Sequence, residues 1–108
     1  MKRFLSLSVA ILVLGAACSK PPQERGHKRV LVLGDSLTEG SGLDPSKAFP
    51  AKLEGLIRAK GFPEVSIMAD GISGSTSDTG PGRLSARYAA GEKYDILILA
   101  LGANDGLR

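Results

Sequence analysis

Two short polar motifs follow two strongly apolar segments of this 108-residue chain. The segment 30–33 leads into a Gly-Asp-Ser-Leu motif that contains Ser36, and the segment 96–101 leads into a Gly-Ala-Asn-Asp motif that contains Asn104. In an open parallel sheet the carboxyl ends of the strands share one edge, and such folds place their chemistry there. A serine hydroxyl at that edge is a candidate nucleophile, and an asparagine amide is a candidate donor to a developing oxyanion.

The elements that must position these residues alternate between strands and helices. Apolar runs predict strands, and one helix is predicted by the stripe formed by Phe49, Leu53, Leu56 and Ile57. Segments rich in glycine and serine are predicted to be loops. The alternation indicates an α/β fold with parallel strands and right-handed crossovers. The expected strands are 30–33, 65–69 and 96–101, the expected helices about 50–60 and 82–90, and the expected loops 34–42 and 70–80.

Three blocks of the sequence resemble those of the SGNH, or GDSL, hydrolase family. They are Gly-Asp-Ser-Leu-Thr-Glu-Gly from Gly34, Ile-Ser-Gly-Ser-Thr from Ile72, and Gly-Ala-Asn-Asp-Gly-Leu-Arg from Gly102. The resemblance covers residues 29–108 and is to the bacterial arylesterase, thioesterase and lysophospholipase-type members. It implies a three-layer, flavodoxin-like α/β fold with a parallel sheet, and a small acyl ester or lipid as the substrate.

The resemblance also assigns roles to residues of the three blocks. Ser36 would be the nucleophile of an ester hydrolase, and the oxyanion hole would consist of the backbone N–H groups of Ser36 and Gly74 and the side-chain amide of Asn104. Ester hydrolysis builds negative charge on the carbonyl oxygen, so its donors must be fixed in advance. Asp35 and Asp105 are predicted to organise their loops. No cofactor or metal is expected, because this chemistry needs none.

The sequence departs from the family in two ways. The family takes its general base from a C-terminal Asp-x-x-His, whereas the sole histidine here, His27, precedes the first strand and is predicted to be a solvated tether residue. Ala69 stands where the family usually has asparagine, with Asp70 beside it. We therefore expect residues 29–108 to be the N-terminal part of a hydrolase domain, truncated after its third strand and inactive by itself. A complete miniature domain is the alternative.

The first 18 residues have the order of a secretory signal peptide. A basic start is followed by an apolar stretch and then by small residues before Cys18, and the apolar stretch is shorter than the roughly 20 residues of a membrane span. Cys18 resembles the lipidated cysteine of a bacterial lipobox, and an ordinary signal peptide with an incidental cysteine is the alternative. We expect 1–18 to be a signal peptide, 19–28 a polar tether, and the protein to be exported and lipid-anchored on the periplasmic side, with Ser19 favouring the outer membrane.

Other classes of function receive less support from the sequence. The net charge of +3 comes largely from the leader, and no basic cluster with interleaved aromatic residues indicates nucleic-acid binding. A non-catalytic flavodoxin-like or anion-binding module, with a phosphate cradled by the loop after the first strand, is an alternative. That loop lacks both nucleotide-binding fingerprints. Thr38 also stands where the α/β-hydrolase nucleophile elbow has glycine.

Overall fold

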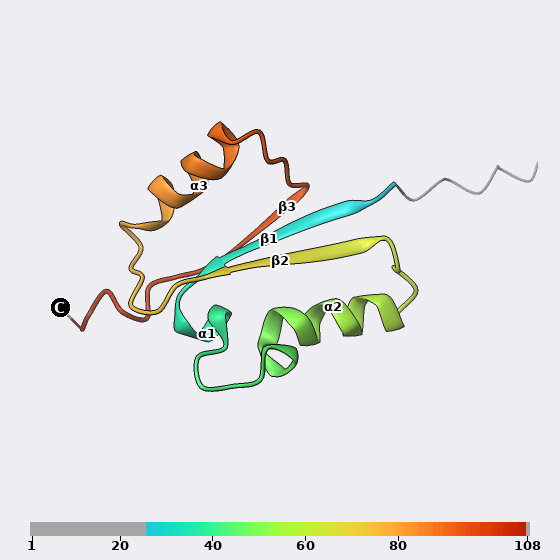
Figure 1. Ribbon diagram of the computed structural model, residues 1–108, viewed down its shortest axis with the longest axis horizontal. Helices are drawn as coiled ribbons and strands as arrows, with labels where there is room; N and C mark the ends of the chain where they lie inside the picture. Colours follow the sequence, from blue (N-terminus) through green and yellow to red (C-terminus); the bar gives the residue numbers. More distant parts are fainter. Residues whose placement is uncertain (1–25, 108) are drawn as a thin grey trace, which may run out of the picture.

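A computed structural model describes residues 26–107 as a three-stranded parallel sheet with helices on both faces (Figure 1). Residues 1–25, and with them Cys18 and the predicted signal peptide, lie outside the described residues. Within 26–107 no helix has both the length and the apolar character that a membrane crossing requires. In chain order the elements are β1 (Lys28–Gly34), α1 (Ser36–Glu39), the 3₁₀ helix η1 (Pro45–Lys47), α2 (Phe49–Ala59), β2 (Val65–Gly71), α3 (Gly80–Ala89) and β3 (Ile96–Ala100).

The central strand of the sheet is β1, because the strand order is β2-β1-β3. Both neighbours run parallel to β1, and Gly34 pairs with Gly71 on one side and with Ala100 on the other. The chain moves first to β2 and then crosses beyond β1 to reach β3, so the direction of winding changes at β1. In open α/β sheets, ligands bind outside the carboxyl ends of the strands at such a switch point.

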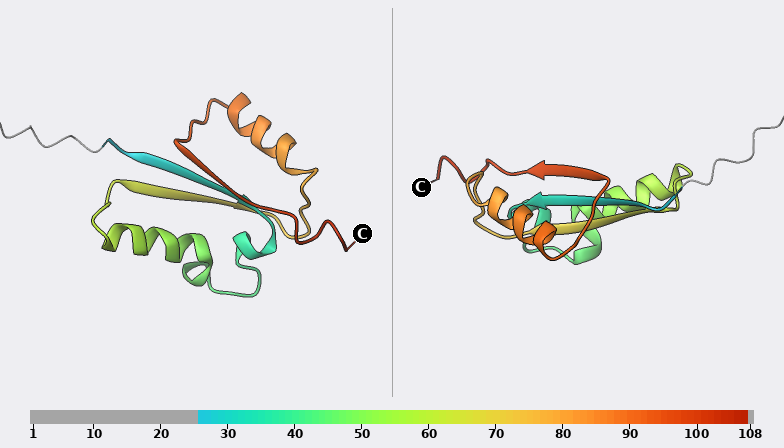
Figure 2. Two further views of the ribbon diagram at one scale, coloured as in Figure 1. Left: turned by 180° about the vertical axis from the view of Figure 1, so that it is seen from behind. Right: turned by 90° about the horizontal axis from the view of Figure 1, so that it is seen from above.

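The sheet is the middle of three layers, which confirms the expected α/β architecture. α1 and α2 lie on one face and α3 lies on the other (Figures 1 and 2). Because helices cover both of its faces, β1 forms the core, with Val30 only 3% exposed and Leu31, Val32 and Leu33 fully buried. Continuous apolar strands are typical of this double coverage.

Several boundaries differ from those expected. β1 begins at Lys28, inside the predicted tether, because its ladder with β2 already starts there. β2 continues to Gly71, so Asp70 belongs to a strand and not to a loop. The predicted loop 34–42 contains α1, which the Asp35 carboxylate caps and Gly40 ends with a φ of 74°. A helix of 4 residues is too short to show an apolar stripe.

Two glycines allow α1 to lie directly against the strand ends. A Cβ atom on Gly71 would lie 2.1 Å from the backbone nitrogen of Glu39, and one on Gly34 would lie 1.9 Å from Thr38 Oγ1. No side chain can be accommodated at such distances without moving the helix. The absence of a Cβ at both positions therefore sets how closely the helix that begins with Ser36 approaches the sheet.

Candidate active site

Ser36 is presented at the carboxyl edge of the sheet by a capped turn. It is the first residue of α1 and is partly exposed, whereas Asp35 before it is 2% exposed. The Asp35 carboxylate accepts a hydrogen bond of 2.9 Å from the N–H of Leu37, which fixes the turn. The first N–H groups of a helix have no acceptor within the helix. The backbone N–H of Ser36 is therefore available to a ligand beside its own hydroxyl.

The second block forms a tight turn around Gly74. The N–H of Ser75 donates to the carbonyl of Ile72 at 3.1 Å, and Gly74 between them has a φ of 79°, a conformation that favours glycine. A Cβ built on Gly74 would have no atom within 4 Å, so the space beside this residue is open. The N–H of Ile72 donates to the carbonyl of Gly34 at 3.2 Å and ties the turn to the end of β1.

Asn104 reaches the same edge from the loop after β3. Its Nδ2 atom donates to the carbonyl of Ser75 at 2.9 Å, and the residue is partly exposed. A carboxamide carries two N–H donors, so one fixes the side chain and the second remains for a ligand. Asp105 Oδ1 accepts a 2.8 Å hydrogen bond from the N–H of Ser77, a second link between the third block and the loop of the second.

These contacts bring the three blocks together at one edge of the sheet. Ser36 and Asn104 follow neighbouring parallel strands, and Gly74 follows the strand on the other side of β1. None of the three residues is buried. A hydroxyl beside backbone and amide N–H donors is the equipment of a serine nucleophile with an oxyanion hole. The individual roles remain predictions, as do the loop-organising roles of Asp35 and Asp105.

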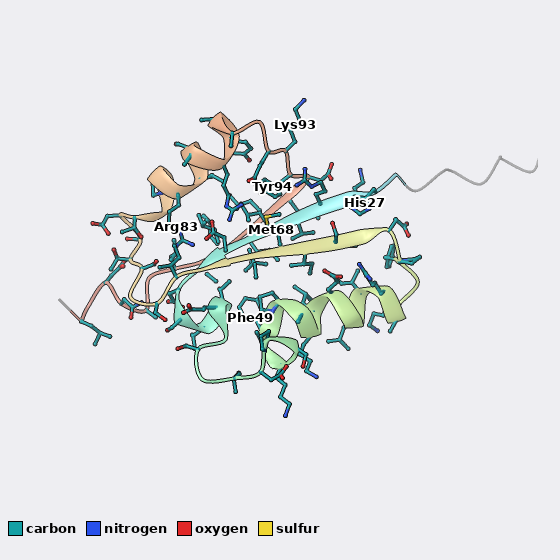
Figure 3. All side chains as sticks on the ribbon, in the orientation of Figure 1. His27, Phe49, Met68, Arg83, Lys93 and Tyr94 are labelled. Carbon is teal, nitrogen blue, oxygen red and sulfur yellow. The ribbon has the colours of Figure 1, made fainter. Side chains whose placement is uncertain are left out.

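The histidine of the described residues, His27, does not lie beside Ser36 (Figure 3). His27 Nε2 lies 2.9 Å from Ser66 Oγ, at the end of the sheet opposite to α1 (Figure 3). His27 is exposed and precedes β1, as the sequence predicted for a solvated residue, and the structure adds a hydrogen bond between its ring and Ser66 of β2. The same range of residues holds no group of three or more histidine, cysteine, aspartate or glutamate side chains that could bind a metal ion.

Sequence reasoning missed a charged cluster next to the second block. Arg83 of α3 donates through Nη1 to the carbonyl of Gly34 at 2.9 Å and to Ser75 Oγ at 3.0 Å. Its Nη2 donates to the carbonyl oxygen and to Oδ1 of Asp70, each at 2.5 Å. Arg87 Nε donates to Asp70 Oδ2 at 2.6 Å. One signal was available in the sequence. Arg83 and Arg87 are four residues apart on a predicted helix, and an aspartate, Asp70, precedes that helix next to the unusual Ala69.

The two arginines keep Asp70 ionised. Burial of this carboxyl raises its pKa, but the hydrogen bonds from Arg87 and Arg83, together with their positive charges, outweigh burial and hold the pKa below the ordinary value of 3.8. The hydrogen bond with Asp70 in turn raises the pKa of the Arg87 guanidinium. At neutral pH the three side chains therefore form a network in which both arginines are paired with the Asp70 carboxylate.

We expect Asp70 to make the stability of the fold sensitive to acid. A carboxyl whose pKa is lower in the folded state stabilises the protein above its unfolded pKa, and this contribution is lost as the pH falls through the folded pKa. The difference in unfolding free energy between the wild type and Asp70→Asn should therefore be largest at neutral pH and shrink once the pH falls below 3.8. Urea unfolding followed by circular dichroism measures this difference.

Glu64→Gln is the control for this experiment, because it also removes one negative charge but lies in the loop before β2. Its effect on unfolding should be small at every pH. A difference between the wild type and Asp70→Asn that does not change with pH would contradict the expectation.

Comparisons with known proteins agree with this geometry. The sequence profile of the GDSL-like lipase/acylhydrolase family matches residues 32–108. The chain is 37% identical over 86 residues to Esterase TesA of Pseudomonas aeruginosa, an alignment that covers 80% of this chain and 42% of that protein. It is 35% identical over 108 residues to the Arylesterase of Vibrio mimicus, covering 100% of this chain and 50% of that protein.

The chain therefore spans half or less of the length of these relatives.

Solved structures of the same family are also similar to this chain. The SGNH-hydrolase family esterase AlinE4 superposes with a TM-score of 0.68 at 38% identity, over 75% of this chain and 43% of that one. The structure of TesA superposes with a TM-score of 0.68 at 38% identity, over 75% of this chain and 44% of that one. The three-stranded sheet and its helices have the fold of SGNH hydrolases.

Proposed function

Because the chain belongs to the GDSL-like lipase/acylhydrolase family, we propose that it carries the nucleophile and the oxyanion hole of a serine ester hydrolase. The hydroxyl of Ser36 attacks the carbonyl carbon of a carboxylic ester, and the N–H groups of Ser36 and Gly74 and the amide of Asn104 stabilise the oxyanion. The main support is the sheet register, which gives all three blocks a common edge, together with the 2.9 Å hydrogen bond that holds the Asn104 amide on Ser75, next to Gly74.

The reaction follows from these positions. As the bond between Ser36 Oγ and the carbonyl carbon forms, the hydroxyl proton passes to a general base and negative charge develops on the carbonyl oxygen. Collapse of this intermediate breaks the ester bond, the leaving alcohol takes the proton back, and water then releases the acid from the acyl-serine. We propose that the base is the histidine of the family's Asp-x-x-His, which is absent from the 108 residues.

The proposed substrates are small acyl esters. The relatives bear the names esterase and arylesterase, and a further one, from Escherichia coli K12 and 39% identical over 79 residues, the name thioesterase 1/protease 1/lysophospholipase L1. The test is to purify the complete protein that the gene encodes and to supply p-nitrophenyl acetate and butyrate. Hydrolysis is expected, and its absence with both esters would reject the proposal. The 108-residue chain, assayed beside it, is expected to be inactive because it lacks the base.

We further propose that Cys18 attaches the exported protein to the periplasmic side of the envelope, with the outer membrane favoured. Lipidation of the thiol and of the new N-terminus would supply several acyl chains, which hold a protein on a membrane more firmly than one. We expect labelled palmitate to be incorporated into the wild type and not into Cys18→Ala, which should move to the soluble fraction. Retention of the label in Cys18→Ala would contradict lipidation at this position.

A further inference from the structure

We propose that Arg83 is a positioning residue that holds the oxyanion hole in place, an inference that rests on the proposed function. Arg83 belongs to α3 and lies between that helix and the sheet (Figure 3). Among residues 26–107, none of its hydrogen bonds goes to Ser36, Gly74 or Asn104. Its hydrogen bonds to Gly34 and Ser75 instead join the first block to the second. The third block is bound to the second through the hydrogen bond of Asn104 to Ser75.

Two of the four hydrogen bonds of Arg83 hold residues that lie close to proposed donors in the chain. The Gly34 carbonyl, which accepts 2.9 Å and 3.2 Å bonds from Arg83 and from the N–H of Ile72, begins the turn that presents Ser36. Ser75 Oγ accepts from Arg83 at 3.0 Å, and Ser75 directly follows Gly74. The carbonyl of the same Ser75 accepts the amide of Asn104 at 2.9 Å. A shift of Ser75 therefore moves both the Gly74 N–H and the Asn104 amide.

The acceptors of Arg83 lie on two sides of its side chain, an arrangement that suits the planar guanidinium group. Nη1 donates to Gly34 and Ser75 on one side, and Nη2 donates twice to Asp70 on the other. A lysine ammonium has three donors at one point and lacks the rigid planar fork that spans these positions. The side chains of Arg83 and Asp70 are only 16% and 11% exposed, so water competes poorly for the bonds.

Arg87 provides a matched comparison on the same helix. It binds the other oxygen of the Asp70 carboxylate at 2.6 Å and is also largely buried. Its remaining bonds go to Met68 Sδ, Glu92 and Tyr94, none of which belongs to the three blocks. Replacement of Arg87 therefore weakens the same ion cluster without releasing Gly34 or Ser75.

The test compares Arg83→Lys with Arg87→Lys in the complete protein. We expect Arg83→Lys to lower kcat for p-nitrophenyl butyrate by about tenfold to a hundredfold with little change in KM, because misplaced donors weaken transition-state stabilisation alone. Arg87→Lys should lower the Tm but keep a kcat close to that of the wild type. A kcat that is unchanged in Arg83→Lys, or that falls equally in both variants, overturns the proposal.

A second readout does not depend on hydrolysis. In amide NMR spectra, the signals of the Gly74 N–H and of the Asn104 side chain should shift in Arg83→Lys and stay in place in Arg87→Lys. Shifts that are absent in Arg83→Lys overturn the positioning role even if kcat falls. An inactive wild type rejects the proposed function, and the NMR shifts then still decide whether Arg83 holds the blocks together.

A milder variant covers the case in which Arg83→Lys does not fold. Ser75→Ala removes one acceptor of Arg83 and keeps the carbonyl that binds Asn104. It should lower kcat several-fold in the same direction and move the same two amide signals. A Ser75→Ala protein with unchanged kcat and unchanged signals overturns the proposal.

Discussion

Ser36→Ala in the complete protein is expected to abolish ester hydrolysis and to leave the fold intact. Without the hydroxyl no acyl-serine can form, and kcat/KM should fall by at least about four orders of magnitude. Ser36 is partly exposed, and its hydroxyl makes no hydrogen bond to the rest of residues 26–107, so its removal breaks no contact there. Hydrolysis of p-nitrophenyl butyrate and the Tm, measured on the same preparation, test both halves of the expectation.

Ser41→Ala is the matched control for this substitution. Ser41 is an exposed serine just beyond the end of α1, and its hydroxyl also lacks a hydrogen bond to the described part of the chain. Activity close to that of the wild type is therefore expected. If Ser36→Ala and Ser41→Ala retained the same activity, Ser36 would not be the nucleophile.

The sequence predicted the parallel sheet and the common edge at which the three blocks lie. Both predictions follow from the apolar runs that mark the strands. A continuous run such as Leu31–Leu33 is stable only with both faces covered, and residues 31 to 33 are fully buried. Parallel strands then bring their following loops to one edge whatever the loops contain. The positions of Ser36 and Asn104 at a common edge could therefore be predicted without side-chain detail.

The Arg83 cluster could not be predicted in the same way, because half of the acceptors of Arg83 are backbone carbonyls, which leave no signal in the sequence. Two of the four are the backbone carbonyls of Gly34 and Asp70, which every residue type carries. Asp70 itself was assigned to a loop, and its place in β2 depends on pairing with Leu33. The hydrogen bond between the exposed His27 and Ser66 was not predictable for a similar reason, since the two residues are 39 positions apart in the sequence.

Two replacements of Asn104 should show whether its amide acts as a hydrogen-bond donor to the oxyanion or only packs within its loop. Asn104→Ala removes one donor of the proposed oxyanion hole, and kcat is expected to fall by about 10²–10³ with KM nearly unchanged, because the oxyanion exists only beyond the ground state. Asn104→Asp keeps the shape of the side chain but should lose more. An ionised carboxylate accepts hydrogen bonds and donates none, so it repels both the oxyanion and the Ser75 carbonyl that the amide now binds.

Asp105→Asn distinguishes this loss from a general disturbance of the third block. The substitution keeps an oxygen that can accept the 2.8 Å bond from the N–H of Ser77, and it removes the negative charge of the residue next to Asn104. Its kcat should stay within a few-fold of the wild type. Comparable losses in Asn104→Ala and Asp105→Asn would point to loop order as the cause. A normal kcat in Asn104→Asp would remove Asn104 from the oxyanion hole altogether, because a negative charge cannot stabilise a second one at hydrogen-bond distance.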